Sequence, residues 1–260
     1  MIVLLLKGLA AGLIVGFVTA SIKSWVDRFF LVIILVIILV IILVGLLQMP
    51  IQEAVVVNLV VVSLAALMML LRQSQVLISV QTDWPLVIIP AVLGGALGRI
   101  LALNIGAMWL LGALGVYAIL TGLRLLLVKP MPERDDKAHS AWIAPVAALS
   151  GALAGLLSAG GKPFTVPLYN VALGHHPGRA YALATLSVVS GTWMGLLTQV
   201  ALGHSLAQKD LLLAAYLFVV IVVTALLVER FWTPGLNRVV TYVIAPILVL
   251  VGVQFMWVAL

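Results

Sequence analysis

A glycine-rich apolar segment ends in a lysine and a proline just past the middle of the chain, where residues 151–163 read GALAGLLSAGGKP. The Gly-x3-Gly spacing lets helices pack closely. Gly160-Gly161 followed by Lys162-Pro163 predicts a helix break, because proline lacks an amide donor and restricts the residue before it. The next apolar segment, 164–174, would cover only about 16 Å as a helix, too little to cross a bilayer. These residues therefore predict a broken or re-entrant element.

The composition around this segment is that of an integral membrane protein. Of 260 residues, 65% are apolar and only 22 are charged, 14 basic and 8 acidic. Soluble domains carry about 25% charged residues, so this chain cannot cover a water-facing surface. The basic residues lie mainly between apolar runs, where they set topology and do not indicate nucleic-acid binding. With no cysteine, a disulfide and a Cys-ligated metal are excluded.

Ten apolar segments are bounded by charge, proline or glycine. They lie at 2–20, 29–47, 53–71, 84–103, 107–128, 141–159, 164–174, 178–202, 210–228 and 238–259. The first has no signal-peptide pattern, and we interpret it as an uncleaved helix. Alternating connections put ten Lys and Arg on one side and four on the other. The positive-inside rule makes the richer side cytoplasmic and places both termini outside.

The sequence also contains an internal repeat. The charged, Pro-rich stretch 129–140 is a predicted cytoplasmic linker between a first repeat, 1–128, and a second, 141–260. Residues 12–23 align without gaps on 151–162, and Arg99 and Gly122 have the same spacing as Glu229 and Gly252. Each half has five segments, so the second enters the membrane from the opposite side. We predict an all-α polytopic membrane protein with two inverted repeats and broken helices near the midplane, an architecture typical of secondary transporters.

The two aligned breaks supply the candidate binding site. Lys162 and the backbone amides released at the break suit a small anion, and Lys23 would supply the symmetry-related wall. The alternative is that both lysines lie in ordinary loops and extend to the interface. Hydroxyls in the following helices could likewise bond to their own carbonyls. The predicted substrate-binding residues are Thr19, Ser21, Lys23, Ser24, Asn58, Ser158, Gly160, Gly161, Lys162, Pro163, Thr185 and Ser187.

Two adjacent histidines, His175 and His176, stand at a predicted cytoplasmic turn. Histidine titrates near neutral pH and could relay a proton in coupled transport, although adjacent histidines in a turn are otherwise simply solvated. No carboxylate joins them in a metal or hydrolase pattern, and no HExxH, GxSxG or P-loop motif occurs. We therefore predict no enzymatic activity, no cofactor and no metal. A second peculiarity, the repeated Val-Ile-Ile-Leu of 32–43, is typical of a lipid-facing helix.

Several stretches resemble the TauE/SafE family of sulfite and organosulfonate exporters. Residues 150–168, SGALAGLLSAGGKPFTVPL, are similar to the family's Gly-rich segment GxxxGxxGxGGGxxxxPxL, and residues 179–187, RAYALATLS, to its RAxxTS helix. Residues 93–99, LGGALGR, through GLR at 122–124 resemble its GxxxGxRL…GLxLL pair of helices. The first repeat departs from this pattern, since it lacks the glycine cluster and has Arg28 where Pro167 aligns.

The resemblance implies export of a small sulfur-containing anion, such as sulfite, sulfoacetate or another organosulfonate, across a bacterial inner membrane. The expected mechanism is alternating access at a midplane anion site. The expected partners are the anion, the lipid bilayer and a coupled proton, with no nucleic acid, and an oligomer is compatible with the sequence. Two alternatives stay open at this point. The same residues could line a passive anion channel, or the chain could be a non-transporting membrane scaffold.

Overall fold

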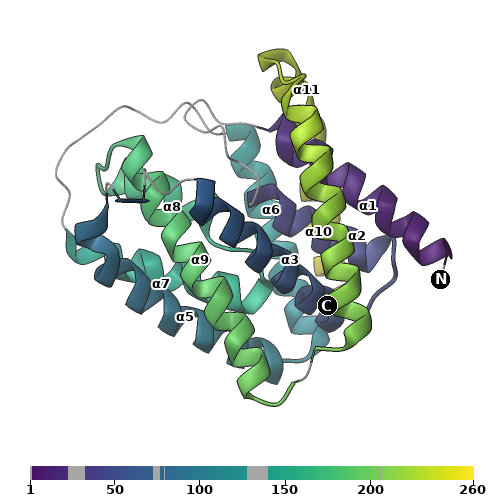
Figure 1. Cartoon of the computed structure of the whole chain (residues 1–260), viewed down its shortest axis with the longest axis horizontal. Coiled ribbons are helices and arrows are strands. Elements are labelled where there is room, and N and C mark those ends of the chain that lie inside the picture. The colour runs from purple at the N-terminus through teal and green to yellow at the C-terminus, as the bar shows by residue number, and fades with distance from the viewer. Residues whose placement is uncertain (1, 23–32, 73–76, 79, 128–139, 205) are drawn as a thin grey trace. The chain divides into compact units, whose positions relative to one another are not determined.

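The computed structural model describes residues 2–22, 33–72, 77–78, 80–127, 140–204 and 206–260. Within these ranges the secondary structure is entirely helical, with ten α-helices, two 3-10 turns and one π-helical turn (Figure 1). Six of the described helices are long and apolar enough to cross a membrane. The predicted all-α polytopic class is therefore confirmed. Helices satisfy their own backbone hydrogen bonds, which is what a bilayer requires of this apolar sequence.

The chain forms two compact units, and each draws on both halves of the sequence. Unit 1 comprises Met1–Val61, Ile105–Val128 and Leu206–Leu260, and unit 2 comprises Val62–Asn104 and Lys129–Ser205. The predicted boundary between the two repeats at 129–140 rests on internal sequence similarity, and a division by packing does not test it. It stays a prediction.

Unit 1 contains five whole helices and the first half of a sixth. They are α1 (Ile2–Ser21), α2 (Ile33–Gly45), α6 (Ala107–Leu127), α10 (Gln208–Glu229), α11 (Pro234–Ala259) and the start of α3 (Ile51–Arg72). The predicted segments agree with these bounds to within a few residues, and α11 has a local explanation for the difference at its start. It begins four residues before the predicted 238, because the Thr233 hydroxyl accepts a 3.1 Å hydrogen bond from the Leu236 amide and Pro234 occupies the first turn.

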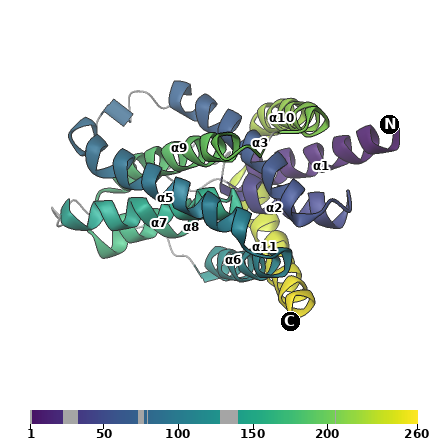
Figure 2. The ribbon, with the colours of Figure 1, turned by 90° about the horizontal axis from the view of Figure 1, so that it is seen from below.

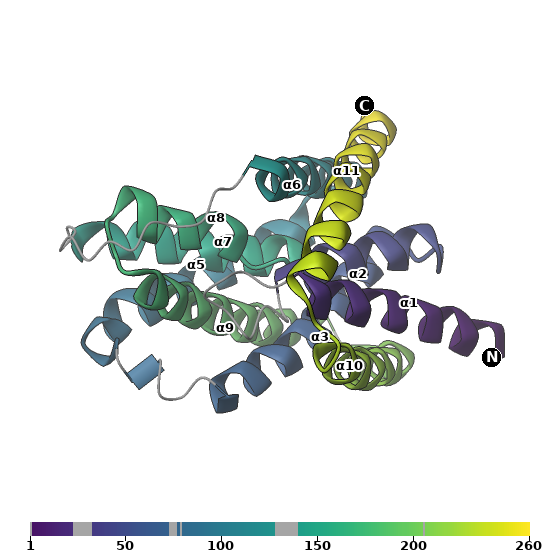
Figure 3. The same cartoon turned by 90° about the horizontal axis from the view of Figure 1, so that it is seen from above.

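Two helix pairs in unit 1 pack through glycine (Figure 3). Successive glycines of α1 meet residues of α10 in the same order, so the two helices are parallel: Gly8 faces Tyr216, Gly12 faces Val220 and Gly16 faces Thr224. The α6 and α11 helices are antiparallel, since Gly115 lies against Gly252 and Gly122 lies against Ala245. Small residues let these backbones approach closely.

The repetitive helix α2 differs in part from its sequence-based interpretation. Its Leu39, Val40 and Leu43 side chains are fully buried, and the helix packs against α1. In a uniformly apolar helix no side is more polar than another, so the sequence cannot distinguish a packed face from a lipid-facing one. That the opposite side of α2 faces lipid stays a prediction.

Unit 2 is built on three parallel helices, α5 (Trp84–Asn104), α7 (Ile143–Leu157) and α9 (Pro177–Ala201), which lie side by side in Figure 2. Gly94 of α5 lies against Ala148, and Gly98 lies against Ala152 one turn later, so α5 and α7 run in the same direction. Gly191 of α9 packs against both Gly95 and Gly151, which brings the three backbones together at one level. Short turns, η2 (Gln81–Asp83) and η3 (Ser140–Trp142), precede α5 and α7.

The predicted short segment forms a hairpin with α7. Helix α8 (Lys162–Pro167) continues into a π-helical turn, η4 (Leu168–Ala172). The Tyr169 hydroxyl in η4 donates a 3.3 Å hydrogen bond to the carbonyl of Ile143, the first residue of α7. The chain therefore returns to the end of unit 2 from which α7 started, as a re-entrant element does.

Candidate functional site

The break between α7 and α8 is set by local backbone chemistry. Helix α7 ends at Leu157, and Ser158 and Gly160 both adopt the left-handed conformation, each with φ of 56°. A side chain at Gly160 would also collide with Val188 of α9, so glycine is required there for space as well. Helix α8 then starts at Lys162, with Pro163 in its first turn. The predicted break is therefore found where the glycine pair and the proline placed it.

Lys162 is almost completely buried, with 1% of its surface exposed. Its Nζ donates a 3.2 Å hydrogen bond to the Tyr181 hydroxyl of α9 and lies 4.3 Å from the centre of the Tyr181 ring. The ring face attracts the cation, and the hydroxyl gives it a polar neighbour. Lys162 therefore does not lie in a solvated loop. Tyr181 was not among the predicted site residues, because an aromatic residue four positions into a helix carries no distinguishing signal.

Two further hydroxyls adjoin the break and were not predicted. Ser150 of α7 lies directly against the Gly161 backbone, and Thr165 is one turn after Lys162 on α8. Both side chains are 0% exposed, and their hydroxyls have no hydrogen-bond partner among the described residues. A buried hydroxyl is costly unless it is hydrogen-bonded. These two groups are therefore available to a polar ligand at the break.

The predicted hydroxyls of α9 are held by their own helix. Thr185 donates to the Tyr181 carbonyl and Ser187 to the Leu183 carbonyl, both at 2.8 Å. This is the back-bonding that competes with ligand binding in transmembrane helices. The hydroxyl protons of these two side chains are engaged, and only their lone pairs remain for a ligand.

The structure gathers only part of the predicted set. Ser158, Gly160, Gly161, Lys162 and Pro163 form the break itself, and α8 packs on α9, which carries Thr185 and Ser187. The remaining described members belong to unit 1: Thr19, Ser21 and Asn58, all buried. Lys23 and Ser24 lie outside the described residues.

The two adjacent histidines differ in environment. His175 is buried, its carbonyl accepts a 2.8 Å hydrogen bond from Asn170 Nδ2, and its ring centre lies 6.2 Å from that of Tyr169. His176 is exposed and caps α9, its Nδ1 accepting a hydrogen bond from the Gly178 amide. Of the two, His175 has the environment of a buried titratable group. A role of either residue in coupling stays a prediction.

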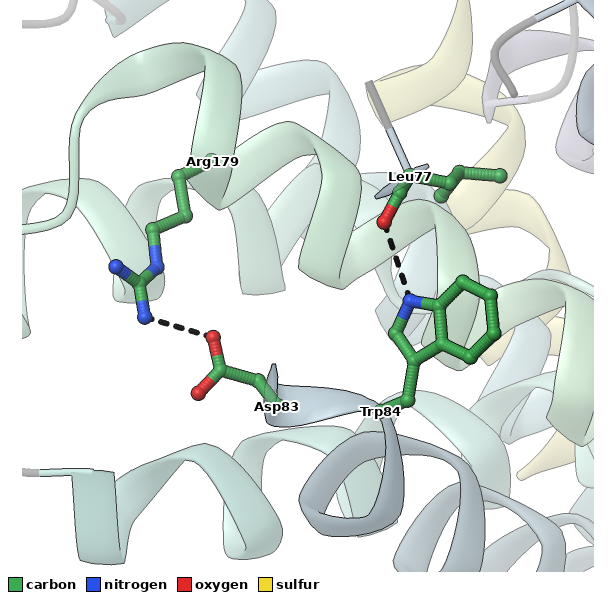
Figure 4. A network of polar contacts seen from close by, with 4 residues as sticks. All are labelled: Leu77, Asp83, Trp84 and Arg179. Carbon is green, nitrogen blue, oxygen red and sulfur yellow. Dashed lines mark hydrogen bonds and ion pairs between the residues drawn. The ribbon is translucent and has the colours of Figure 1, made fainter. Parts of the chain in front are cut away.

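Polar contacts also join α5 and α9 at both ends. At their starts, Arg179 Nη2 of α9 lies 2.7 Å from Oδ2 of Asp83, the residue before α5 (Figure 4). Next to this pair, the Trp84 indole donates a 3.1 Å hydrogen bond to the Leu77 carbonyl of the segment before α5. At the other end, Arg99 Nε donates a 2.7 Å hydrogen bond to Gln199 Oε1. Arg99 belongs to the internal repeat and to the family resemblance but was not predicted as a site residue, and its partner lies 100 positions away. Within the described part of the chain, no three His, Asp or Glu side chains are placed to hold a metal ion.

Comparison with known proteins gives one match. Residues 9–255 match the family described as Sulfite exporter TauE/SafE. No curated protein and no solved structure matches the sequence. The match covers nearly the whole chain, including both units.

Proposed function

Because the chain belongs to the TauE/SafE family, whose members are membrane transporters and not enzymes, we propose that it exports a small sulfur-containing anion by alternating access. Sulfite, sulfoacetate and other organosulfonates are the substrates that the family implies. The membrane would be the inner membrane of a bacterium, with both termini on the outer side, as the distribution of Lys and Arg predicts. The observation that carries the proposal is the buried Lys162 at the break between α7 and α8.

The chemistry around Lys162 supports an anionic substrate. The ammonium group is removed from water, and it donates a hydrogen bond to the Tyr181 hydroxyl. A charge inside a membrane protein is costly and marks a functional site by default. The Ser150 and Thr165 hydroxyls beside the same break can donate to oxyanion oxygens. A cation together with neutral donors can balance a singly charged oxyanion while hydrogen-bonding its several oxygens.

Helix packing supports the inverted repeat that alternating access requires. The correspondence between the halves, 130 residues apart near their ends, equates α6 with α11. These two helices are antiparallel, and their contacts are reciprocal. At this offset Gly115 is equivalent to Ala245 and Gly252 to Gly122, and both the pair Gly115 and Gly252 and the pair Gly122 and Ala245 are in contact. A two-fold axis in the membrane plane would produce this pattern, because it reverses the direction of equivalent helices.

A second packing correspondence also supports the repeat. With α1 equated to α7 and α10 to α5, the parallel pair α1 and α10 of unit 1 corresponds to the parallel pair α7 and α5 of unit 2. Gly12 against Ile221 then corresponds to Gly151 against Ala91, position for position. Each unit would thus contain helices from both repeats. The repeats 1–128 and 141–260 would be halves of the sequence, but neither would form a compact unit by itself.

The proposal is tested by sulfite and sulfoacetate efflux from proteoliposomes. Lys162→Ala should reduce sulfite efflux at least tenfold, while Lys209→Ala, at a lysine whose side chain is 72% exposed, should match the wild type. Lys162→Arg keeps the charge and should retain part of the flux. Unchanged efflux in Lys162→Ala would overturn the site, and efflux that does not saturate with concentration would point to a passive channel. No efflux of any tested anion by the wild type would contradict the function itself.

A further inference from the structure

A second buried cation lies in unit 2, on the helix that packs against the last turn of α7. Arg99 is on α5, inside a candidate membrane span, and only 3% of its surface is exposed. Its position on the helix faces α9, whose Gln199 is 5% exposed. Arginine keeps its charge under all ordinary conditions. Unit 2 therefore holds a permanent positive charge out of water, between α5 and α9.

The described neighbours of Arg99 do not neutralise this charge. Its Nε donates to Gln199 Oε1 at 2.7 Å, and Gln199 Nε2 in turn donates to the His204 carbonyl at 3.4 Å. Within the described residues Arg99 makes no ion pair. An amide oxygen orients a guanidinium but carries no countercharge, and buried charges in proteins are normally paired. The Arg99 and Gln199 side chains are thus held together without a carboxylate partner for Arg99 among the described residues.

Helix C-terminal ends offset the Arg99 charge only in part. The last turn of α7 lies beside Arg99, since a side chain at Gly155 would come within 2.8 Å of the Arg99 amide nitrogen. Helix ends carry roughly half a negative charge, and this attraction falls off within the last turn. Arg99 stands five residues before Asn104, the last residue of α5, which is more than one turn away. A guanidinium, by contrast, presents several N–H groups in a plane that matches the oxygens of an oxyanion. Anion binding is the use that fits a buried arginine held by an amide.

We propose that Arg99 and Gln199 form a second binding site for a small oxyanion, such as sulfite or a sulfonate group. The inference rests on the proposed function and extends it, because it gives the exported anion another contact in unit 2. Gln199 lies 18 residues along α9 from Tyr181, the partner of Lys162, which corresponds to about 27 Å of helix. Lys162 and Arg99 would therefore meet the anion at opposite ends of α9, one after the other along its path.

The test measures sulfite binding to the purified full-length protein by thermal stabilisation in a Lys162→Ala background. This variant should keep a residual response to sulfite, which comes from Arg99. Adding Gln199→Glu places a carboxylate beside Arg99, which should compete with sulfite and weaken the residual binding at least tenfold. Adding Asn104→Asp makes the same amide-to-acid change at an exposed residue at the end of α5 and should leave the response unchanged.

The outcomes separate the two proposals. Absence of residual binding in Lys162→Ala, or residual binding that Gln199→Glu does not weaken, would overturn the second site and leave the Lys162 site standing. Absence of any sulfite response in the wild type would contradict the proposed function. Should Lys162→Ala not fold, equilibrium dialysis with radiolabelled sulfite replaces it: the wild type should bind two sulfite ions per chain and Gln199→Glu one. A wild-type stoichiometry of one would again overturn the second site.

Discussion

The helix pair α5 and α7 of unit 2 and the helix pair α1 and α10 of unit 1 use glycine in different ways. A methyl group at Gly155 or Gly151 of α7 would overlap a backbone carbonyl of α5, so these two helices touch main chain to main chain. A methyl group at Gly12 of α1 would mainly meet the Val220 side chain, and one at Gly8 the Tyr216 ring. Backbone cannot move aside as a side chain can, so the α5 and α7 pair is the more sharply constrained of the two. Gly16 of α1 also faces a backbone carbonyl, that of Ile221, but at 2.8 Å where Gly151 and Gly155 have 2.1 Å.

The same contrast holds for the ion pairs. In unit 2, Asp83 and Arg179 are 2.7 Å apart with side-chain exposures of 10% and 41%. In unit 1, Glu53 and Lys209 are 3.6 Å apart with exposures of 43% and 72%. The unit that holds the buried cations Lys162 and Arg99 thus also has the shorter and better shielded ion pair of the two. A rigid scaffold suits buried charges, because their few polar partners must stay at fixed distances.

The largest expected effect comes from glycine substitution in this comparison. Gly151→Ala should lower the free energy of unfolding by about 3 kcal/mol, because the methyl group forces the α5 and α7 backbones apart. Gly12→Ala, at the aligned position of α1, should cost about 1 kcal/mol, since Val220 can adjust. Thermal or denaturant unfolding in detergent measures both.

A control separates packing from helix propensity. Alanine favours helix over glycine by about 1 kcal/mol, and Gly112 of α6 has room for a methyl group, which would meet Ala259 at an ordinary 3.5 Å. Gly112→Ala should therefore be neutral or stabilising. Equal costs for Gly151→Ala and Gly12→Ala would remove the distinction between the two units.

The sequence predicted the features that depend on local chemistry. The apolar runs predicted the helices, and Gly160-Gly161 before Lys162-Pro163 predicted the break, because glycine and proline act through their own backbone geometry. The late start assigned to α11 was an error of the same local kind, since Thr233 and Pro234 are recognisable capping residues that hydropathy alone did not weigh.

The remaining features depend on contacts across the fold. Tyr181 became the partner of Lys162, and Gln199 that of Arg99, only because helix packing brings together residues that are separated in sequence. The units also combine segments from both halves, which a linker in the sequence cannot reveal. Thr185 and Ser187 illustrate the reverse case, since polar residues expected in the site bond to their own helix.

A smaller effect is expected at the ion pair of unit 2. Asp83→Asn removes the charge that holds Arg179 at the start of α9, where Arg179 Nε is already buried without a partner among the described residues. The pair is half-buried and short, so the coupling energy between Asp83 and Arg179 should be about 1 kcal/mol. A double-mutant cycle with Asp83→Asn and Arg179→Gln measures it. Additive effects of the two changes would show that the contact does not stabilise unit 2.

The smallest effect is expected at Glu53 and Lys209 of unit 1. These side chains are exposed and 3.6 Å apart, so water screens their attraction and ordering two long side chains offsets much of it. A cycle with Glu53→Gln and Lys209→Gln should give a coupling of about 0.3 kcal/mol that vanishes in high salt. The Asp83 and Arg179 coupling should persist in the same salt, because Asp83 is largely shielded from solvent. Equal salt sensitivity of the two pairs would mean that the constraint on unit 2 comes from its glycine packing and not from its charges.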